Sequence, residues 1–216
     1  MTTAALTDLQ AVGGRVTYAY ALVVNTELPA KNAAQLVKLS KASPSGLTYG
    51  SAGVGTGAHL VTELFQTETG GNFNHAPYKG VAPAQTDLVG GHIDFMFDTV
   101  GTAAPLVRAG KLHAIGVTSK SRTPAFPDVP AISESISGFQ NVGWYALFAP
   151  NGVPKEAINR LNSEINKIYK DAEYRKFFES NDFTAATETP EELTAVVKEE
   201  FSLWGKVVDS AGIKKK

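Results

Sequence analysis

Apolar residues fall into short runs of strand-like or helix-like spacing, separated by glycine and proline. The strand-like runs are rich in β-branched and aromatic residues and end at turn signals. They cover residues 16–24, 47–49, 73–78, 93–97, 112–118, 143–149 and 183–186. Runs with helical spacing cover residues 32–42, 60–68, 84–89, 103–109, 154–170, 172–180 and 189–208, with a brief helical piece at 132–136. This rhythm of strand, loop and helix predicts an α/β layer with a largely parallel sheet.

Two long helices near the C-terminus have apolar faces that need a sheet to cover them. The helix over residues 154–170 places Ile158, Leu161 and Ile165 on one face. The last helix begins after Thr189, a favourable N-cap residue, and carries a longer apolar stripe. Few strands accompany these helices in the sequence. We therefore expect that part of the sheet beneath them is missing from this chain.

A glycine-rich loop follows the strand at residues 47–49. Glycines allow tight turns and bring backbone N–H groups close to a ligand, and the helix start adds unpaired donors and partial positive charge. The loop therefore predicts a site for a carboxylate or phosphate. The alternative is a plain turn between strand and helix. The spacing does not fit G-x-G-x-x-G, a P-loop or G-x-S-x-G. The candidate ligand contacts in this loop are Gly50, Ser51, Ala52, Gly53, Gly55 and Thr56.

Other polar residues near strand ends are candidates for the same site, since ligands of open α/β sheets lie beyond the carboxyl ends of the strands. Asp98 ends an apolar strand and is either a cap for the next helix or a ligand contact, with Thr99 beside it. His59 lies in the first turn of the helix after the glycine loop. The other three histidines fall on unrelated elements, which favours surface or hydrogen-bonded core roles and no metal site. No catalytic triad or paired carboxylate is visible, which favours a binding protein.

Composition narrows the class of protein further. The 216 residues carry a net charge of −1 and 43% hydrophobic residues, which describes a globular protein without an electrostatic footprint for nucleic acid or anionic membranes. The absence of cysteine excludes disulfides and thiolate metal sites. The N-terminus has no basic region followed by an apolar core, so no signal peptide is visible. We expect either a cytosolic protein or a sequence that begins downstream of the true start.

Several motifs together resemble the periplasmic receptors of tripartite tricarboxylate transporters, the Bug family. They are LTYGSAGVGTGAHL at residues 47–60, APYKGVAPAQTDLVGGHIDFMFD at 76–98, LHAIGVTS at 112–119, PDVP at 127–130 and GWYALFAP at 143–150. The resemblance covers the chain from about residue 8. It implies a two-lobed, periplasmic-binding-protein-like (type II) α/β fold with a largely parallel sheet in each lobe and with one lobe incomplete. One lobe would be residues 23–142, and the other would combine residues 1–22 with 143–216.

The resemblance also implies a function. Members of this family bind a small organic carboxylate in the cleft between their lobes and deliver it to the membrane components of the transporter. The ligand is held largely by backbone amides and water from two facing loops, of which residues 50–56 match one. The segment matching the other loop is absent here, which implies an N-terminally truncated receptor. Tyr18 departs from the polar residue expected at the first crossover, and it would either narrow the cleft or stack against a ring. The implied receptor is periplasmic and has no cofactor, metal or catalytic residue.

Two alternatives remain open at this stage. An α/β enzyme could use the glycine loop to hold a phosphate or carboxylate substrate, with Asp98 or His59 as its catalytic group. A truncated fragment without function is the second alternative, and its uncovered apolar faces would promote self-association.

Overall fold

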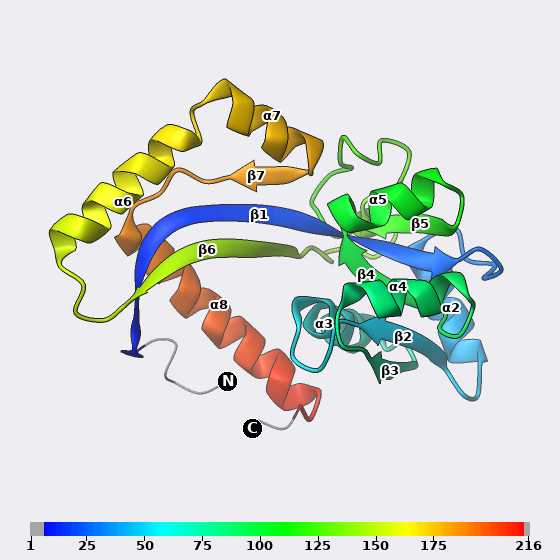
Figure 1. The fold of residues 1–216 in the computed structure, drawn as a ribbon. Coiled ribbons are helices and arrows are strands. Elements are labelled where there is room, and N and C mark those ends of the chain that lie inside the picture. The colour runs from blue at the N-terminus through cyan, green and yellow to red at the C-terminus, as the bar shows by residue number, and fades with distance from the viewer. Residues whose placement is uncertain (1–6, 214–216) are drawn as a thin grey trace. The chain divides into compact units, whose positions relative to one another are not determined.

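The computed structural model describes residues 7–213 of the chain. Contacts divide it into two compact units. The first combines the chain up to Tyr18 with the segment from Trp144 onward, and the second is Ala19–Gly143. The sequence-based lobe boundaries fall after residues 22 and 142, within four residues of these positions. Strand β1 (Leu9–Asn25) is long enough to contribute residues to both units (Figure 1).

The second unit is a five-stranded sheet in the order β3-β2-β4-β1-β5. Its other strands are β2 (Leu47–Ser51), β3 (Phe73–Pro77), β4 (Phe95–Thr99) and β5 (Leu112–Val117). Strand β2 pairs in parallel with β3 and β4, whereas β1 pairs antiparallel with β4 and β5. Four strands therefore run in one direction and β1 runs in the other. The sheet is therefore mixed. The sequence did not predict the direction of β1, because apolar patterning predicts a strand without fixing its direction.

Both faces of this sheet are covered by helices. These are α2 (Ala33–Ala42), α3 (Gly57–Thr69), α4 (Val81–Val89) and α5 (Val100–Arg108). Consecutive residues of β1 from Ala21 to Val24 are fully buried, although they point alternately to opposite faces. Burial on both faces explains why this strand is a continuous apolar run rather than an alternating one.

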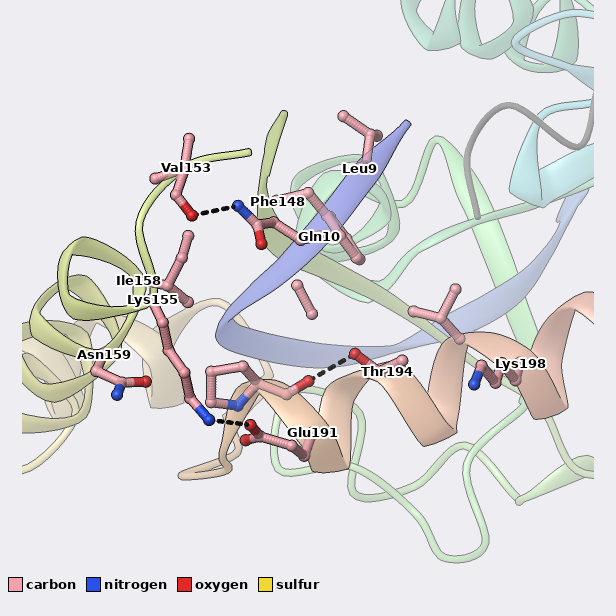
Figure 2. A pocket seen from close by; sticks show the side chains of 13 residues that line it. Leu9, Gln10, Phe148, Val153, Lys155, Ile158, Asn159, Glu191, Thr194 and Lys198 are labelled. Atoms are coloured by element: carbon pink, nitrogen blue, oxygen red, sulfur yellow. Dashed lines mark hydrogen bonds and ion pairs between the residues drawn. The ribbon is translucent and has the colours of Figure 1, made fainter. Parts of the chain in front are cut away.

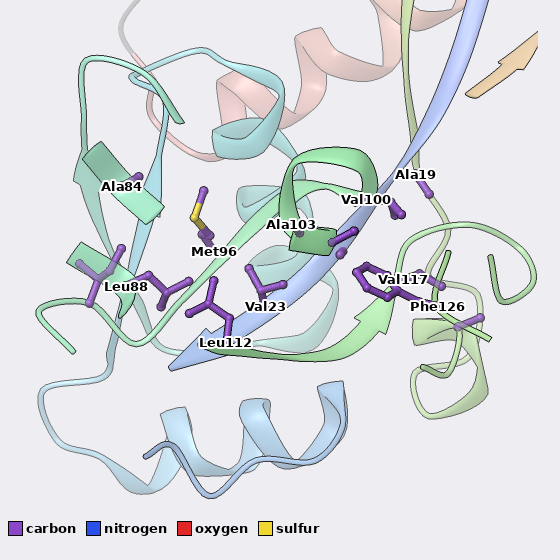
Figure 3. Close-up of a cluster of buried hydrophobic side chains, with 14 residues drawn as sticks. Ala19, Val23, Ala84, Leu88, Met96, Val100, Ala103, Leu112, Val117 and Phe126 are labelled. Atoms are coloured by element: carbon purple, nitrogen blue, oxygen red, sulfur yellow. The ribbon is translucent and has the colours of Figure 1, made fainter. Parts of the chain in front are cut away.

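One face of the sheet carries the apolar cluster shown in Figure 3, which joins β1, β4 and β5 to α4 and α5. Val23, Leu88 and Met96 belong to this cluster and are fully buried. An aromatic group forms a separate cluster, in which Phe65 of α3 contacts Phe97 and Phe139 edge to face. The sheet is thus held from both sides by side chains that the apolar pattern of the sequence selects.

Local capping explains where the helices begin and end. Asn32 caps α2 by accepting the N–H of Gln35, and Gly70 ends α3 in the left-handed conformation that favours glycine. Helices α4 and α5 each begin three residues before the predicted start. The reason at α4 is Pro83, which the first turn of a helix tolerates because the N–H it lacks would be unpaired there.

The first unit contains β6 (Val142–Pro150), β7 (Phe183–Ala185) and the helices α6 (Lys155–Ile168), α7 (Ala172–Ser180) and α8 (Pro190–Ser210). The N-terminal part of β1 pairs with β6, and it pairs antiparallel with β7. The expected parallel pairing is therefore wrong for β7. Helix α8 begins with a capping box between Thr189 and Glu192, as the sequence predicts for a helix start.

Candidate functional site

The carboxyl ends of three neighbouring parallel strands define one edge of the sheet in the second unit. Strands β3, β2 and β4 end there, at Pro77, Ser51 and Thr99. Each is followed within a few residues by the start of a helix: α4, α3 and α5, respectively. Strand β1 reaches the same edge because Tyr20 pairs with Thr99. Three helix N-termini therefore gather where the sequence predicts ligand binding.

The glycine loop at this edge is held by its own hydrogen bonds. Ser51 Oγ accepts the N–H of Gly53 at 3.1 Å, and Thr56 Oγ1 donates to the Gly53 carbonyl at 2.8 Å. Gly53 and Gly55 have φ angles of 132° and 81°, which side-chain-bearing residues rarely adopt. Gly50 lies within β2, and a side chain there would meet Ile93. The two predicted hydroxyl donors, Ser51 and Thr56, thus serve the loop itself.

Backbone N–H groups remain available to a ligand. Thr56 is the N-cap residue of α3 but makes no side-chain capping bond. Within residues 7–213, the N–H groups of Ala52, Val54, Gly57 and Ala58 have no hydrogen-bond acceptor. A helix start with uncapped N–H groups carries partial positive charge and accepts anions. The loop is therefore built to present main-chain donors, not side chains.

Tyr20 defines how closely the loop approaches β1. An ideal Cβ built on Gly57 would lie 2.1 Å from the Tyr20 hydroxyl and 3.3 Å from its ring carbon Cζ. Tyr20 is buried, so its ring has little room to move. Glycine at the first position of α3 is therefore a packing requirement. The sequence analysis selected Tyr18 on this strand and missed Tyr20, which lies two residues further along β1.

A network of aromatic and polar side chains lies behind the loop. The rings of His59 and His75 stack with their centroids 4.0 Å apart, and Tyr49 stacks on His75 at 4.8 Å. His75 Nε2 lies 2.7 Å from Ser51 Oγ, and the Tyr49 hydroxyl donates to Glu63. Two of the histidines assigned to unrelated elements are thus neighbours. His75 reaches this position because it pairs with Tyr49 across β2 and β3, and the Tyr49 ring stacks on both histidines.

Burial shifts the ionisation of both histidines. It lowers the pKa of His59, while the nearby Glu63 carboxylate opposes this shift. Burial, together with the neighbouring His59, lowers the pKa of His75 to about 4. Burial and the hydrogen bond to Glu63 raise the pKa of Tyr49 above its ordinary value. Both imidazoles are therefore neutral at pH 7, and each has one nitrogen that accepts a hydrogen bond.

The Asp98 carboxylate is held by several hydrogen bonds next to the start of α5. Its side chain accepts hydrogen bonds from Gln85 Nε2 at 2.6 Å, from the Thr99 N–H at 2.8 Å and from Thr102 Oγ1 at 2.5 Å. Asp98 is 2% exposed, and burial raises its pKa against the opposing effect of these bonds. Thr99 is the N-cap of α5 and accepts the N–H of Thr102. The helix cap is thus Thr99, and the Asp98 carboxylate supports it by binding the Thr99 N–H and the Thr102 hydroxyl.

Replacing Asp98 by asparagine tests whether its carboxylate supports the start of α5. The amide keeps the size of the carboxylate but has one acceptor oxygen, so either Gln85 or Thr102 loses its partner. We expect the free energy of unfolding to fall by about 1 kcal/mol, measured by urea unfolding. Asp128→Asn, at an exposed position, should stay within about 0.5 kcal/mol of the parent. Unchanged stability of Asp98→Asn would contradict this supporting role of the carboxylate.

Tyr18 belongs to the first unit and lies in an aromatic group. Its ring stacks on Tyr145 with centroids 4.8 Å apart and meets Phe183 edge to face at 6.2 Å. These contacts explain why an aromatic residue stands at this position of β1.

The first unit also contains a cavity of about 370 Å³ (Figure 2). Its walls come from the start of β1, the end of β6 and the first turns of α6 and α8. Gln10 Nε2 donates to the Val153 carbonyl at 3.0 Å, and Lys155 pairs with Glu191 at 3.7 Å. None of the sequence-predicted site residues lines this cavity. Gln10 and Lys155 are thus bonded within the cavity wall.

No group of three or more metal-ligating side chains occurs among residues 7–213 that could hold a metal ion. The histidine pair has Glu63 within reach of His59, but these groups do not converge on a common point as a metal would require.

Comparison with known proteins identifies the family. Residues 1–213 match the family described as tripartite tricarboxylate transporter family receptor. The chain belongs to this receptor family. The match confirms the resemblance drawn from the motifs at residues 47–60 and 76–98.

Relatives of the receptor include proteins solved with bound carboxylates. BugT of Bordetella pertussis is 32% identical, over 90% of this chain and 60% of BugT. An R. palustris protein solved with adipate has a TM-score of 0.87 and 29% identity, over 95% of this chain and 69% of its own. MatC from Rhodopseudomonas palustris with bound malate has a TM-score of 0.80 and 26% identity, over 93% and 69% of the two chains. These structures confirm an α/β fold of the periplasmic-binding-protein kind.

The receptor chain spans 56–60% of the length of the first curated relatives that it matches. Among the helices within residues 7–213, none has both the length and the apolar character to cross a bilayer.

Proposed function

We propose that this chain is the receptor part of a tripartite tricarboxylate transporter and that it captures a small organic carboxylate. The proposal includes a periplasmic location and delivery of the ligand to the membrane components of the transporter. Family membership supports the location and the delivery, and the relatives solved with adipate and malate support the capture of a carboxylate. No cofactor or metal is required for this function.

The observation that carries the proposal is the set of main-chain donors around the start of α3. The N–H groups of Ala52, Val54, Gly57 and Ala58 lie within seven consecutive residues and have no acceptor in residues 7–213. A carboxylate has two oxygens that each accept several such bonds. Hydrogen bonds to an ionised acceptor are stronger than those between neutral groups, and the helix dipole adds to them.

The enzyme alternative has weaker support. Asp98 already receives three hydrogen bonds, and His59 Nδ1 already accepts one from Gly55. Neither candidate base is therefore available to a substrate without breaking its present contacts. We propose a binding role without catalysis.

Isothermal titration of the purified protein with adipate, malate, succinate and acetate tests the proposal. We expect saturable binding of at least one dicarboxylate at pH 7.5. Gly57→Ala should weaken it roughly tenfold, because the new methyl group displaces either the first turn of α3 or Tyr20. Gly205→Ala is the matched control, because its Cβ would meet nothing within 4 Å, and it should leave affinity unchanged. Absence of binding across the panel, or equal affinity for the parent and Gly57→Ala, would contradict the proposal.

A further inference from the structure

His59 connects the glycine loop to the buried network behind it. Its Nδ1 accepts the N–H of Gly55 at 3.0 Å, and its Nε2 lies 3.7 Å from Glu63 Oε1. Because Nδ1 accepts, the proton of the neutral ring is on Nε2 and points toward Glu63. The side chain is 5% exposed, so water cannot replace the bond to Gly55 easily. The position of Gly55 therefore depends on the protonation state of this ring.

The groups that face the ring come from three elements. Glu63 lies on the same helix, His75 is stacked against the ring from β3, and Tyr49 and Ser51 contribute from β2. Burial disfavours a positive charge on His59 and lowers its pKa, whereas Glu63 favours the charge. The Glu63 carboxylate also accepts a hydrogen bond from Tyr49, which fixes it beside His59. The ring is thus held from its edge and from its face.

Ser51 extends the network to a second point of the loop. Its hydroxyl has one proton, which goes either to the Gly53 carbonyl at 3.1 Å or to His75 Nε2 at 2.7 Å. Its lone pairs accept the Gly53 N–H. The two stacked imidazoles therefore hold two loop glycines, His59 directly and His75 through Ser51.

We propose that His59 is a positioning residue for carboxylate binding: its neutral imidazole holds the loop in the form that presents its N–H groups, and protonation of His59 releases the loop. The inference rests on the proposed function and adds a pH dependence to it. On protonation, Nδ1 becomes a donor and meets the N–H of Gly55, so the hydrogen bond is replaced by repulsion. A positive charge on His59 also faces His75 at stacking distance. The loop then loses its anchor at Gly55, while Glu63 retains the imidazolium in place.

NMR of the ligand-free protein tests the anchor without reference to binding. Between pH 8 and pH 5 we expect the Gly55 amide resonance to move with the same midpoint as the His59 ring, below pH 6.5. In His59→Asn, the amide oxygen can accept the Gly55 N–H and does not titrate, so this movement should disappear. His113→Asn is the matched control at an exposed position and should behave as the parent. A Gly55 resonance that does not follow the His59 ring would overturn the inference, even if the variant failed to fold.

Titration with adipate then tests the consequence for affinity. Adipate itself gains protons at low pH, but this affects the parent and His59→Asn alike. We expect the ratio of parent to variant affinity to fall roughly three- to tenfold between pH 7.5 and pH 5, as the loss of one internal hydrogen bond would produce. A constant ratio would overturn the inference. Absence of adipate binding at every pH would instead count against the proposed function, because the NMR titration measures the loop anchor independently.

Discussion

Phe65→Ala is expected to lower the free energy of unfolding by about 3–5 kcal/mol. The Phe65 side chain is fully buried on α3, and three other aromatic rings surround it. Its centroid lies 5.2 Å from that of Phe139, 5.6 Å from Phe97 and 5.8 Å from Phe73. Alanine would leave a cavity among rings that are anchored on three other segments of the second unit and cannot collapse fully. Urea unfolding followed by tyrosine and tryptophan fluorescence measures the change.

Phe177→Ala is the control for this prediction. Phe177 lies on α7 and is 56% exposed, so the same change of side chain should cost about 1 kcal/mol or less. Equal losses in the two variants would show that the aromatic cluster around Phe65 does not stabilise the fold. Because Phe65 anchors α3, the helix that begins at the glycine loop, to the sheet, its loss should also weaken carboxylate binding.

Acidification is expected to destabilise the second unit through His75. Burial, together with the neighbouring His59, lowers the pKa of His75 to about 4 in the folded protein, against about 6.5 in an unfolded chain. Between these values the unfolded state binds more protons, so stability is complete above pH 6.5 and falls as the pH decreases. At pH 5 the loss from this one group is about 1–2 kcal/mol. Melting temperatures measured from pH 8 to pH 5 follow the loss.

His75→Gln isolates this contribution from the other titrating groups. Glutamine can still bond to Ser51 but does not take up a proton, so the decrease between pH 8 and pH 5 should be smaller by about 1–2 kcal/mol. His113→Gln should have the same pH dependence as the parent, because His113 is exposed on β5. If the His75→Gln profile matched the parent profile, the histidine pair would not be the source of acid sensitivity.

Much of the second unit can be predicted from apolar patterning and turn residues. The glycine loop lies between a strand and a helix as expected, and Gly70 ends that helix. The run from residue 16 to 24 is a strand, but its direction depends on the chain path and not on its own residues. That is why β1 proves antiparallel within an otherwise parallel arrangement.

The network behind the loop could not be predicted because it depends on pairing between separate segments. His59 and His75 are 16 residues apart and meet only because β3 lies beside β2 and α3 packs against β2. Nothing in the spacing of the two histidines reveals this. Likewise, Asp98 ends a strand in either of its possible roles, and only the positions of Gln85 and Thr102 show that its carboxylate is bonded within the protein.

The loop's own bonding has a consequence for how ligand choice can change over evolution. Its hydroxyls and its histidine are committed to internal contacts, and what it offers outward is main-chain N–H groups, which every non-proline residue supplies in the same form. Such a donor set recognises a carboxylate as a chemical group and is indifferent to the rest of the molecule. A receptor of this design can therefore acquire a new ligand by substitutions elsewhere while the loop stays as it is. Under the proposed function, we therefore expect substitutions that change ligand choice to lie outside residues 50–56.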